Sequence, residues 1–440
     1  MGLTAKVLLG MGLGVIVGLA INLLGLYAPE SFTAVYIVDG FFHVIGKLFI
    51  NSLKMLVVPL VLFSLICGVC GIGDIRLLGR IGSKSFVLYM LTTAIAVATA
   101  ITIAATAGIG QGMEQKASVE FSGREAPPLA EVIIRIIPSN PIAAMANGEM
   151  LSIIFFATLT GVSLLMVGKK AGPLIEGAAL ANEVMMKMVG IVMAVAPYAV
   201  FCLLAKAMAQ LGMGLLVQLL GYVVVLVFAL LFHLFFTLQL VLKVFSGLSP
   251  LVFLKKIRSA QIFAFSTASS NATIPVTLRA VTKRMGVDNS VAAFTVPFGA
   301  TINMDGTAIM QGVATVFIAN VYGVDLGIGG YLTVILMSVL ASIGTAGVPG
   351  VGLIMLSMVF GQVGLPVEGI GLIIGVDRLM DMVRTAVNVS GDGVVSCIVA
   401  SSENKLDKEI FSDPLAGHID IESSLHIEPV PADADTTKTE

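Results

Sequence analysis

The sequence has few charged residues. Only 12% of its 440 residues are Asp, Glu, Lys or Arg, whereas 57% are hydrophobic, and the mean hydropathy is +1.01. A soluble domain normally carries about 25% charged residues, so this chain has too few to cover a soluble surface. The net charge of -2 gives no basis for binding nucleic acid. The composition therefore predicts an integral protein of the lipid bilayer.

Cysteine is also scarce, and the first 30 residues do not have the pattern of a cleavable signal. Cys67 and Cys70 form a C-x-x-C inside an apolar helical run without a second pair, which favours buried small residues over metal or redox chemistry. No small-residue cleavage site follows the apolar run Gly14–Leu24. We therefore expect residues 5–27 to form the first membrane helix.

Apolar runs of membrane length recur along the chain. About 20 apolar residues suffice for one helical crossing. Runs of this kind occur at 5–27, 41–72, 84–109, 149–168, 177–208, 213–244, 287–321 and 367–401. The pattern predicts an all-α polytopic membrane protein with eight transmembrane helices.

Two further segments, 250–282 and 330–364, each have two short apolar arms joined by a small polar tip. Irregular backbone at membrane depth survives only where protein or a water-filled cavity satisfies its polar groups. Paired broken segments of this kind indicate an inverted repeat with a binding site near the midplane. We expect two opposed re-entrant helical hairpins, although ordinary loops outside the membrane are the alternative.

The distribution of positive charge predicts the topology. With eight crossings and an internal amino terminus, one set of basic residues in the connections faces the cytoplasm, as the positive-inside rule prefers, whereas the loop 111–131 falls outside and is acidic on balance. The basic set comprises Arg76, Arg80, Lys84, Lys169, Lys170, Lys255, Lys256, Arg258, Arg279, Lys283, Arg284, Lys405 and Lys408. Residues 403–440 are polar and acidic and predict a disordered cytoplasmic tail.

The last predicted helix carries a polar stripe. In the segment 375–395, most polar groups fall within an arc of about 100° when each residue turns the helix by about 100°. Charges inside a spanning helix are costly and usually functional. Arg384 can grip a carboxylate with two N–H groups, and Asp381 can pair with it or accept hydrogen bonds from an ammonium. Asn388 lies on the same arc, and Asp392, further along, could hold a hard cation. A salt-bridge stripe that only joins helices is the alternative.

The segment 298–312 places Asn303, Asp305 and Thr307 beside Gly299 and Gly306 in an apolar stretch. Glycines around a short polar run allow a helix to unwind, and unwound carbonyls with one carboxylate form an oxygen cage suited to sodium. A glycine-kinked packing helix is the alternative.

The tips of the two expected hairpins are rich in small residues. Ser269, Ser270, Gly344 and Gly347 would let the backbone approach a ligand closely. Backbone N–H groups at such tips could donate hydrogen bonds to an anion.

One polar cluster lies earlier in the chain. Tyr89, Thr92 and Thr93 occur in an apolar run, and by themselves they are typical of helix-packing polar residues.

Three motifs together resemble the glutamate transporter family, the dicarboxylate/amino acid:cation symporters. They are NMDGTA (303–308), SIGTAGVPG (342–350) and DMVRTAVNVSGD (381–392), and the resemblance extends from about residue 5 to 402. It implies a homotrimer in which a fixed scaffold (about 5–72 and 128–212) supports a transport part (about 82–110 and 213–402). That transport part would slide as an elevator.

The resemblance also implies the ligand sets. Arg384 would hold the side-chain carboxylate of the substrate, and Asp381 its amino group. The α-carboxylate would contact Asn388, Ser270 and the backbone around Val348 and Gly352, with Thr307 and Thr385 nearby. Three sodium sites would use Asp392 with Gly299, Asn303 and Asn388; Thr301, Ser342, Ile343 and Thr345; and Asp305 and Asn303 with Tyr89, Thr92 and Thr93.

Two positions depart from the family pattern. Gln311 stands where animal glutamate carriers have an acidic residue that carries a proton, which argues against that route of proton cotransport. The first hairpin tip lacks the arginine of some microbial members, whereas Arg378 adds a charge beside Asp377.

The sequence therefore predicts a sodium-coupled symporter of glutamate or aspartate in a bacterial inner membrane, with both termini cytoplasmic and without a cofactor other than sodium ions. A C4-dicarboxylate symporter, proton- or sodium-coupled, is the alternative on the same fold, but Asp381 would repel a substrate without an amine. An intramembrane enzyme is disfavoured, because an aspartyl pair works without a neutralising arginine such as Arg384. A pure ion channel would not need a carboxylate site matched to an amine.

Overall fold

The structure, a computed structural model, describes residues 3–28, 30–70, 78–112, 134, 136–344, 347, 350–414 and 416. Regular structure within these residues is helical, apart from one isolated bridge between Val287 and Leu406. Five helical stretches are long and apolar enough to cross a membrane: Ala5–Leu23, Thr33–Cys67, Arg80–Ala107, Ser152–Ala194 and Met213–Ser246. The prediction of an all-helical protein with several membrane-length apolar helices is confirmed for the described residues.

One group of helices comes from the amino-terminal segment and the middle of the chain. Its members are α1 (Leu3–Leu23), η1 (Thr33–Phe42), α2 (His43–Cys70), α6 (Pro141–Asn147), α7 (Met150–Val167), η3 (Gly168–Ala171), α8 (Gly172–Ala194) and α9 (Ala196–Leu211). α1 lies against α9 because it has glycines where the two backbones meet. A Cβ on Gly10 would lie 2.4 Å from the carbonyl oxygen of Pro197, and one on Gly14 would lie 2.7 Å from that of Phe201. Small residues permit this close approach between helices in lipid.

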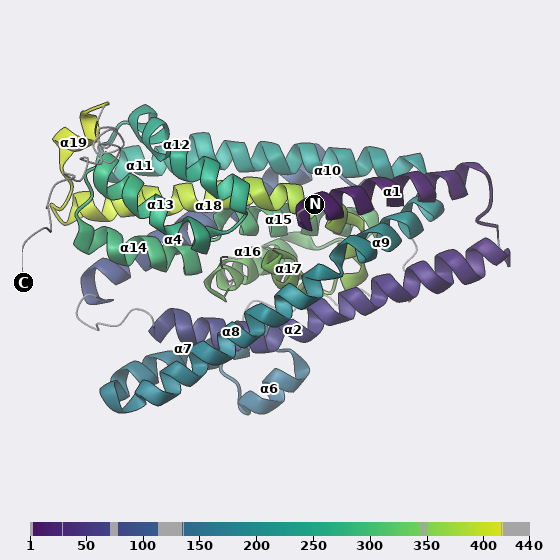
Figure 1. The fold of residues 1–440 in the computed structure, drawn as a ribbon, viewed down its shortest axis with the longest axis horizontal. Helices are drawn as coiled ribbons and strands as arrows, with labels where there is room; N and C mark the ends of the chain where they lie inside the picture. The colour runs from purple at the N-terminus through teal and green to yellow at the C-terminus, as the bar shows by residue number, and fades with distance from the viewer. Residues whose placement is uncertain are drawn as a thin grey trace, which may run out of the picture.

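A second group contains the polar motifs. Its members are η2 (Leu78–Gly82), α4 (Ser83–Ala107), α10 (Met213–Phe232), η4 (His233–Thr237), α11 (Leu238–Ser246), α12 (Pro250–Thr267), α13 (Ser270–Arg279), η5 (Ala280–Arg284), α14 (Asn289–Ile302), α15 (Asp305–Val321), α16 (Gly327–Gly344), α17 (Val351–Val363), η6 (Val367–Gly369), α18 (Ile370–Ser402) and α19 (Lys408–Ser412). Figure 1 shows α2, α7 and α8 along one side of the molecule and α10, α12 and α18 along the other.

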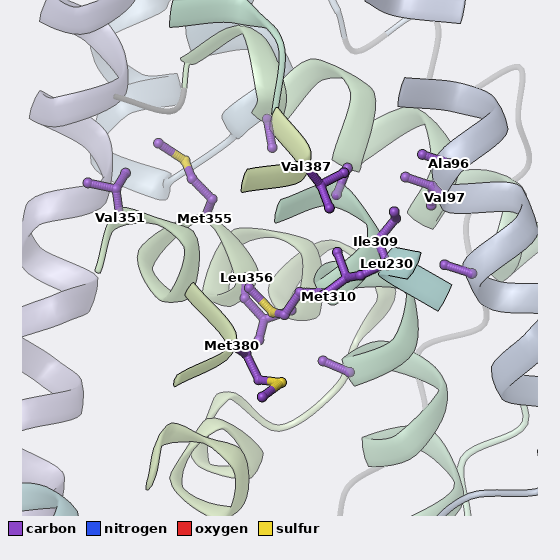
Figure 2. Packing of buried hydrophobic residues seen from close by; sticks show 14 of the residues in the cluster. Ala96, Val97, Leu230, Ile309, Met310, Val351, Met355, Leu356, Met380 and Val387 are labelled. Atoms are coloured by element: carbon purple, nitrogen blue, oxygen red, sulfur yellow. The ribbon is translucent and has the colours of Figure 1, made fainter. Parts of the chain in front are cut away.

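The second group has a packed apolar core around α18 and α15. Figure 2 shows its side chains from α4, α10, α15, α17 and α18, among them Ala96, Leu230, Met310, Leu356 and Val387, all almost fully buried. Burial of this kind keeps the polar residues of α15 and α18 in fixed positions between apolar layers.

The two helical hairpins meet at their tips. α12 and α13 join at Ala268, whose φ of +49° makes the sharp turn, and Ser269 then caps α13 by accepting a hydrogen bond from the N–H of Ala272. The Ser269 hydroxyl also donates to the carbonyl of Gly347, in the tip of the second hairpin, at 2.7 Å. Asn271 N–H donates to the same carbonyl at 3.1 Å. The tips of the two hairpins, far apart in sequence, therefore contact each other through the carbonyl of Gly347.

The helix predicted over 287–321 is broken, as the glycines and polar residues of its middle indicate. α14 ends at Ile302 and α15 begins at Asp305, with Asn303 and Met304 between them in non-helical conformation. The N–H groups at the start of α15 are therefore available to partners outside the helix.

Residues 403–412 differ from the predicted disordered tail. α19 forms within them, and the Phe411 side chain is only 3% exposed. The physical reason is that the segment has an apolar anchor and backbone partners in the bundle, which its acidic composition does not reveal. Residues 417–440 of the predicted tail lie outside the described residues.

We call residues 403–413 the carboxyl-terminal clasp. Asp407 N–H donates to the carbonyl of Gly286 at 2.8 Å. The Lys256 ammonium, 3% exposed on α12, donates to the carbonyl of Ile410 at 2.6 Å and lies over the Phe411 ring. The clasp thus binds the base of the first hairpin.

Candidate functional site

The polar stripe of α18 contains a buried ion-pair cluster. Arg384 is 0% exposed, and it donates from Nη1 to Asp377 at 2.7 Å and from Nη2 to Asp381 at 2.9 Å. The second Asp381 oxygen accepts from the N–H of Gly350, at the start of α17, at 3.3 Å. Arg378 lies 3.5 Å from the same oxygen. The guanidinium fork is therefore directed at carboxylates, the geometry that recognises an acidic ligand.

Asp377 has no role in the sequence-based prediction, although it lies on the same helical arc as Asp381 and Arg384. Its position two turns before Arg384 was the signal that could have identified it. The pairing of Asp381 with Arg384, one of the two arrangements expected from the sequence, is the one that the structure contains.

The charged cluster borders a small cavity between the two groups of helices. Its lining combines Asp377, Arg378 and Asp381 with apolar residues of the first group, including Val7 and Phe49. The volume of about 20 Å³ admits a water molecule but no amino acid. Asp377 and Asp381 line this cavity while they pair with Arg384.

Asn388 joins α18 to the break between α14 and α15. Its Oδ1 accepts from the N–H of Gly306 at 2.7 Å. Asn303 Nδ2 donates to the carbonyl of Asn388 at 3.1 Å and to Asp392 Oδ1 at 2.9 Å. A Cβ on Gly306 would lie 2.5 Å from the carbonyl oxygen of Arg384, so only glycine permits this approach. The predicted stripe and the predicted broken helix thus form a single site.

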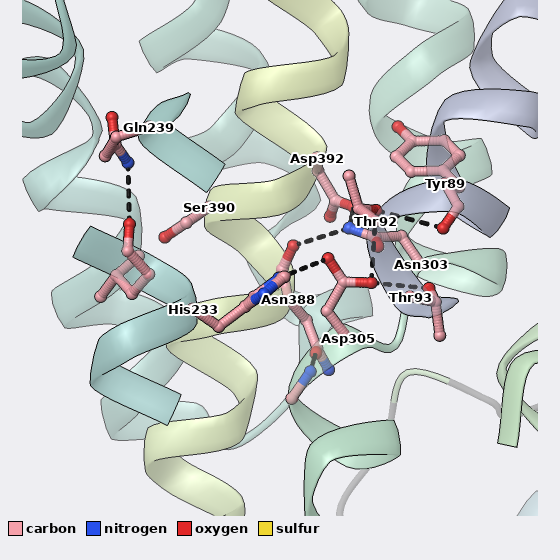
Figure 3. Close-up of polar contacts among 12 residues, drawn as sticks. Tyr89, Thr92, Thr93, His233, Gln239, Asn303, Asp305, Asn388, Ser390 and Asp392 are labelled. Atoms are coloured by element: carbon pink, nitrogen blue, oxygen red, sulfur yellow. Dashed lines mark hydrogen bonds and ion pairs between the residues drawn. The ribbon is translucent and has the colours of Figure 1, made fainter. Parts of the chain in front are cut away.

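A second polar cluster surrounds Asp305, as Figure 3 shows. Asp305 Oδ1 accepts from the Thr93 hydroxyl at 2.6 Å and lies 3.4 Å from that of Thr92. Its Oδ2 lies 3.1 Å from His233 Nε2. The early polar cluster of the sequence is therefore in contact with the broken helix. His233 was not among the predicted site residues, because no motif surrounds it.

Tyr89 lies against α14. Its hydroxyl donates to the carbonyl of Thr295 at 2.9 Å. A Cβ on Gly299 would lie 2.3 Å from Asp392 Oδ1 and 2.6 Å from the Tyr89 hydroxyl oxygen. The backbone of Gly299 therefore lies directly against both groups, and a side chain there would enter the site.

These residues fit a hard cation. The carboxylates of Asp305 and Asp392 and the hydroxyls of Thr92 and Thr93 are all buried, and oxygen atoms of these kinds are the ones that a hard cation prefers. Asn303 Oδ1 is fully buried and accepts no hydrogen bond within the described residues. A buried carbonyl oxygen without a donor costs stability, and a bound cation would satisfy it.

Some of the remaining predicted residues contact Arg384, whereas others bond only within their own helices. A Cβ on Gly352 would be 3.2 Å from Thr307 Cγ2 and 3.4 Å from Arg384 Nη2, so these three lie together. The Thr385 and Thr301 hydroxyls bond to carbonyls of their own helices, as does that of Ser342. Ser270 is buried at the first hairpin tip, and Ile343 is half-buried. Thr345 and Val348 lie outside the described residues.

Comparison with known proteins agrees with the resemblance inferred from the motifs. Residues 3–402 match the model of the sodium:dicarboxylate symporter family. The chain is 35% identical to a proton/glutamate-aspartate symporter of Escherichia coli (strain K12), over 92% of this chain and 93% of that protein. It is 31% identical to a proton/sodium-glutamate symport protein of Bacillus caldotenax (93% and 96%) and 32% identical to a C4-dicarboxylate transport protein of Bacillus subtilis (strain 168) (83% and 88%).

Proposed function

Because the chain belongs to the sodium:dicarboxylate symporter family, we propose that it takes up aspartate or glutamate together with sodium ions across a bacterial plasma membrane. The observation that carries this proposal is Arg384, buried between Asp377 and Asp381 next to the hairpin tips. A buried guanidinium that already pairs with carboxylates can exchange one of them for a substrate carboxylate at little desolvation cost.

The substrate would bind by replacing contacts that the site now makes within itself. Arg384 would hold the side-chain carboxylate, and Asp381, released from Arg384, would accept hydrogen bonds from the substrate ammonium. Thr307 and Gly352 lie against Arg384 and would contact the substrate. Asn388, Thr385, Ser270 and the tip of the second hairpin would complete the site around the α-carboxylate.

Sodium would bind to the oxygen clusters. Asp392 with Asn303 and the carbonyls of Gly299 and Asn388 would hold one ion, and Asp305 with Asn303, Tyr89, Thr92 and Thr93 another. Thr301, Ser342, Ile343 and Thr345 would contribute to a third. A bound sodium supplies positive charge that offsets the buried carboxylates and adds its gradient to the driving force. Support comes from the unpartnered Asn303 Oδ1 and from the close packing of Gly299.

We propose further that the two groups of helices are a scaffold and a transport part that slide past each other in a homotrimer, with both chain termini cytoplasmic. The support is that the site residues all belong to the second group. The cavity beside Asp377 lies on the boundary with the first group. Lys47 of α2 also pairs with Glu368 of η6 across the two groups, at 2.5 Å, and this exposed pair would have to open.

A C4-dicarboxylate is the second candidate substrate, because a relative of this chain carries that name. The Asp381 carboxylate speaks against it, since a dicarboxylate brings no ammonium to neutralise it.

Uptake by purified protein in proteoliposomes distinguishes these possibilities. Labelled aspartate, glutamate and succinate would be offered with a sodium gradient alone, a proton gradient alone, or neither. We expect aspartate and glutamate uptake with sodium alone. Succinate uptake driven by protons alone would refute both the substrate and the coupling ion.

A further inference from the structure

We infer that His233 positions the Asp305 carboxylate for the coupling cation, an inference that rests on the sodium coupling proposed above. His233 lies at the start of η4, between α10 and α11, and the sequence analysis assigns no site residue to these three elements. It acts through Asp305 and, unlike Asp305 and Asp392, is not proposed to contact the ion.

The local backbone brings His233 to Asp305. The residue opens η4, a single π-helical stretch between α10 and α11 in an otherwise α-helical run. Such π turns shift the direction of side chains and are frequent at functional sites. The imidazole is 1% exposed, and its Nε2 lies 3.1 Å from Asp305 Oδ2 (Figure 3). That contact is attractive when Nε2 carries a hydrogen and donates it.

Both oxygens of Asp305 are held as a result. Thr93 donates to Oδ1 at 2.6 Å, and His233 contacts Oδ2 from the opposite side. The carboxylate plane therefore cannot rotate without losing a buried hydrogen bond. A carboxylate fixed in this way presents its free lone pairs in one direction, and hydrogen bonds behind a metal ligand commonly raise the affinity of the site.

The other ring nitrogen indicates that this arrangement serves the site and not the packing. His233 Nδ1 is buried and has no hydrogen-bond partner within the described residues. An unpartnered buried nitrogen lowers stability, so an apolar residue would fit this position better if packing were its only role. The contact with Asp305 is the feature of the histidine that offsets this cost.

The test is a sodium titration of protein stability without substrate. The unfolding temperature of the detergent-solubilised protein would be measured against sodium concentration for the wild type, His233→Leu, His233→Gln and His233→Asn. The Gln amide nitrogen reaches the position of ring Nε2, whereas the shorter Asn amide reaches that of Nδ1. His43→Leu is the matched control, because His43 lies on α2 and contacts Lys206.

We expect His233→Leu and His233→Asn to need about tenfold more sodium for half of the stabilisation. His233→Gln should titrate within about twofold of the wild type, as should His43→Leu. If His233→Leu fails to fold, the comparison of Gln with Asn carries the test. Equal titrations for Gln and Asn, or a wild-type titration for His233→Leu, would overturn the inference. If sodium does not stabilise the wild type, the proposed sodium coupling is itself contradicted.

Discussion

Arg384 and Asp377, two turns apart on α18, form an ion pair of 2.7 Å that is buried from solvent. Arg384 pairs with two carboxylates, and Asp377→Ala removes one of them, so that of the two only Asp381 remains. Because a buried charge then loses a partner, we expect the free energy of unfolding to fall by about 2 kcal/mol. Asp377→Asn keeps an oxygen that accepts from Nη1 and should lose less. Thermal unfolding of the two variants in detergent checks this, and equal losses would show that the hydrogen bond contributes nothing.

Substitution of Arg384 tests the proposed substrate contact. Arg384→Lys retains the positive charge but lacks the two-pronged donor, so aspartate should bind at least about tenfold more weakly. Arg384→Ala removes the charge and should abolish aspartate uptake while sodium still stabilises the protein. Proteoliposome uptake and sodium-dependent unfolding temperature measure the two effects separately. Unchanged aspartate affinity in Arg384→Lys would contradict the assigned role.

Gly299 gives a steric test of the cation site. A Cβ at this position would lie 2.3 Å from Asp392 Oδ1 and 2.6 Å from the Tyr89 hydroxyl oxygen, so Gly299→Ala must displace one of them. We expect at least about tenfold more sodium for half-maximal uptake. Gly361→Ala in α17 is the matched control, because nothing lies within 4 Å of its Cβ. Identical sodium titrations for both variants would place the cation elsewhere.

Asp392 gives an electrostatic test of the same site. Asp392→Asn keeps the shape and the oxygen that can accept from Asn303 Nδ2 but loses the negative charge, so sodium should bind about tenfold more weakly or worse. The exposed Asp325, which accepts from the N–H of Gly327, provides the control Asp325→Asn. Sodium dependence of uptake is the measurement, and a wild-type curve for Asp392→Asn would exclude it as a ligand.

The carboxyl-terminal clasp has a pH-dependent contact. Hydrogen bonds from Lys84 and then Arg80 lower the pKa of Glu403 below its usual 4.5. Because the folded pKa is depressed, this stabilisation is present above pH 4.5 and is lost as the pH falls through the folded value. Glu403→Gln should therefore unfold about 1–3 °C below the wild type at pH 7. The two unfolding temperatures should converge in more acidic buffer, and a constant difference would show that ionisation of Glu403 has no part in it.

The sequence was sufficient for the helical architecture because lipid imposes simple rules. Run lengths, the glycines around Asn303 and Asp305, and the polar arc of α18 each follow from the cost of exposing backbone or charge to hydrocarbon. The contact of Tyr89, Thr92 and Thr93 with the broken helix could not be derived from spacing, because it joins α4 to α15 across more than 200 residues. The resemblance to a family supplied that expectation.

Other features depend on tertiary contacts that leave no local pattern. His233 is a lone histidine in an apolar run, and only the packing of η4 brings it to Asp305. Phe411 is a single aromatic residue in an acidic segment, and its burial depends on its packing in the bundle, where the Lys256 ammonium lies over its ring. Asp377 has the periodicity that places it on the arc of Arg384, but the periodicity does not show which of the two carboxylates, Asp377 or Asp381, pairs with Arg384.

The clasp also provides a fixed position for a reporter on the second group of helices. Leu3 begins α1, which packs on α9 in the first group, whereas residues 403–413 are bonded to α12 and α4 in the second. A donor dye near residue 5 and an acceptor after Asp413 would each follow one group of helices. Energy transfer between them would stay constant while the protein is rigid and would change when one group travels relative to the other. Dyes at these two positions would therefore measure any movement of the first group of helices relative to the second.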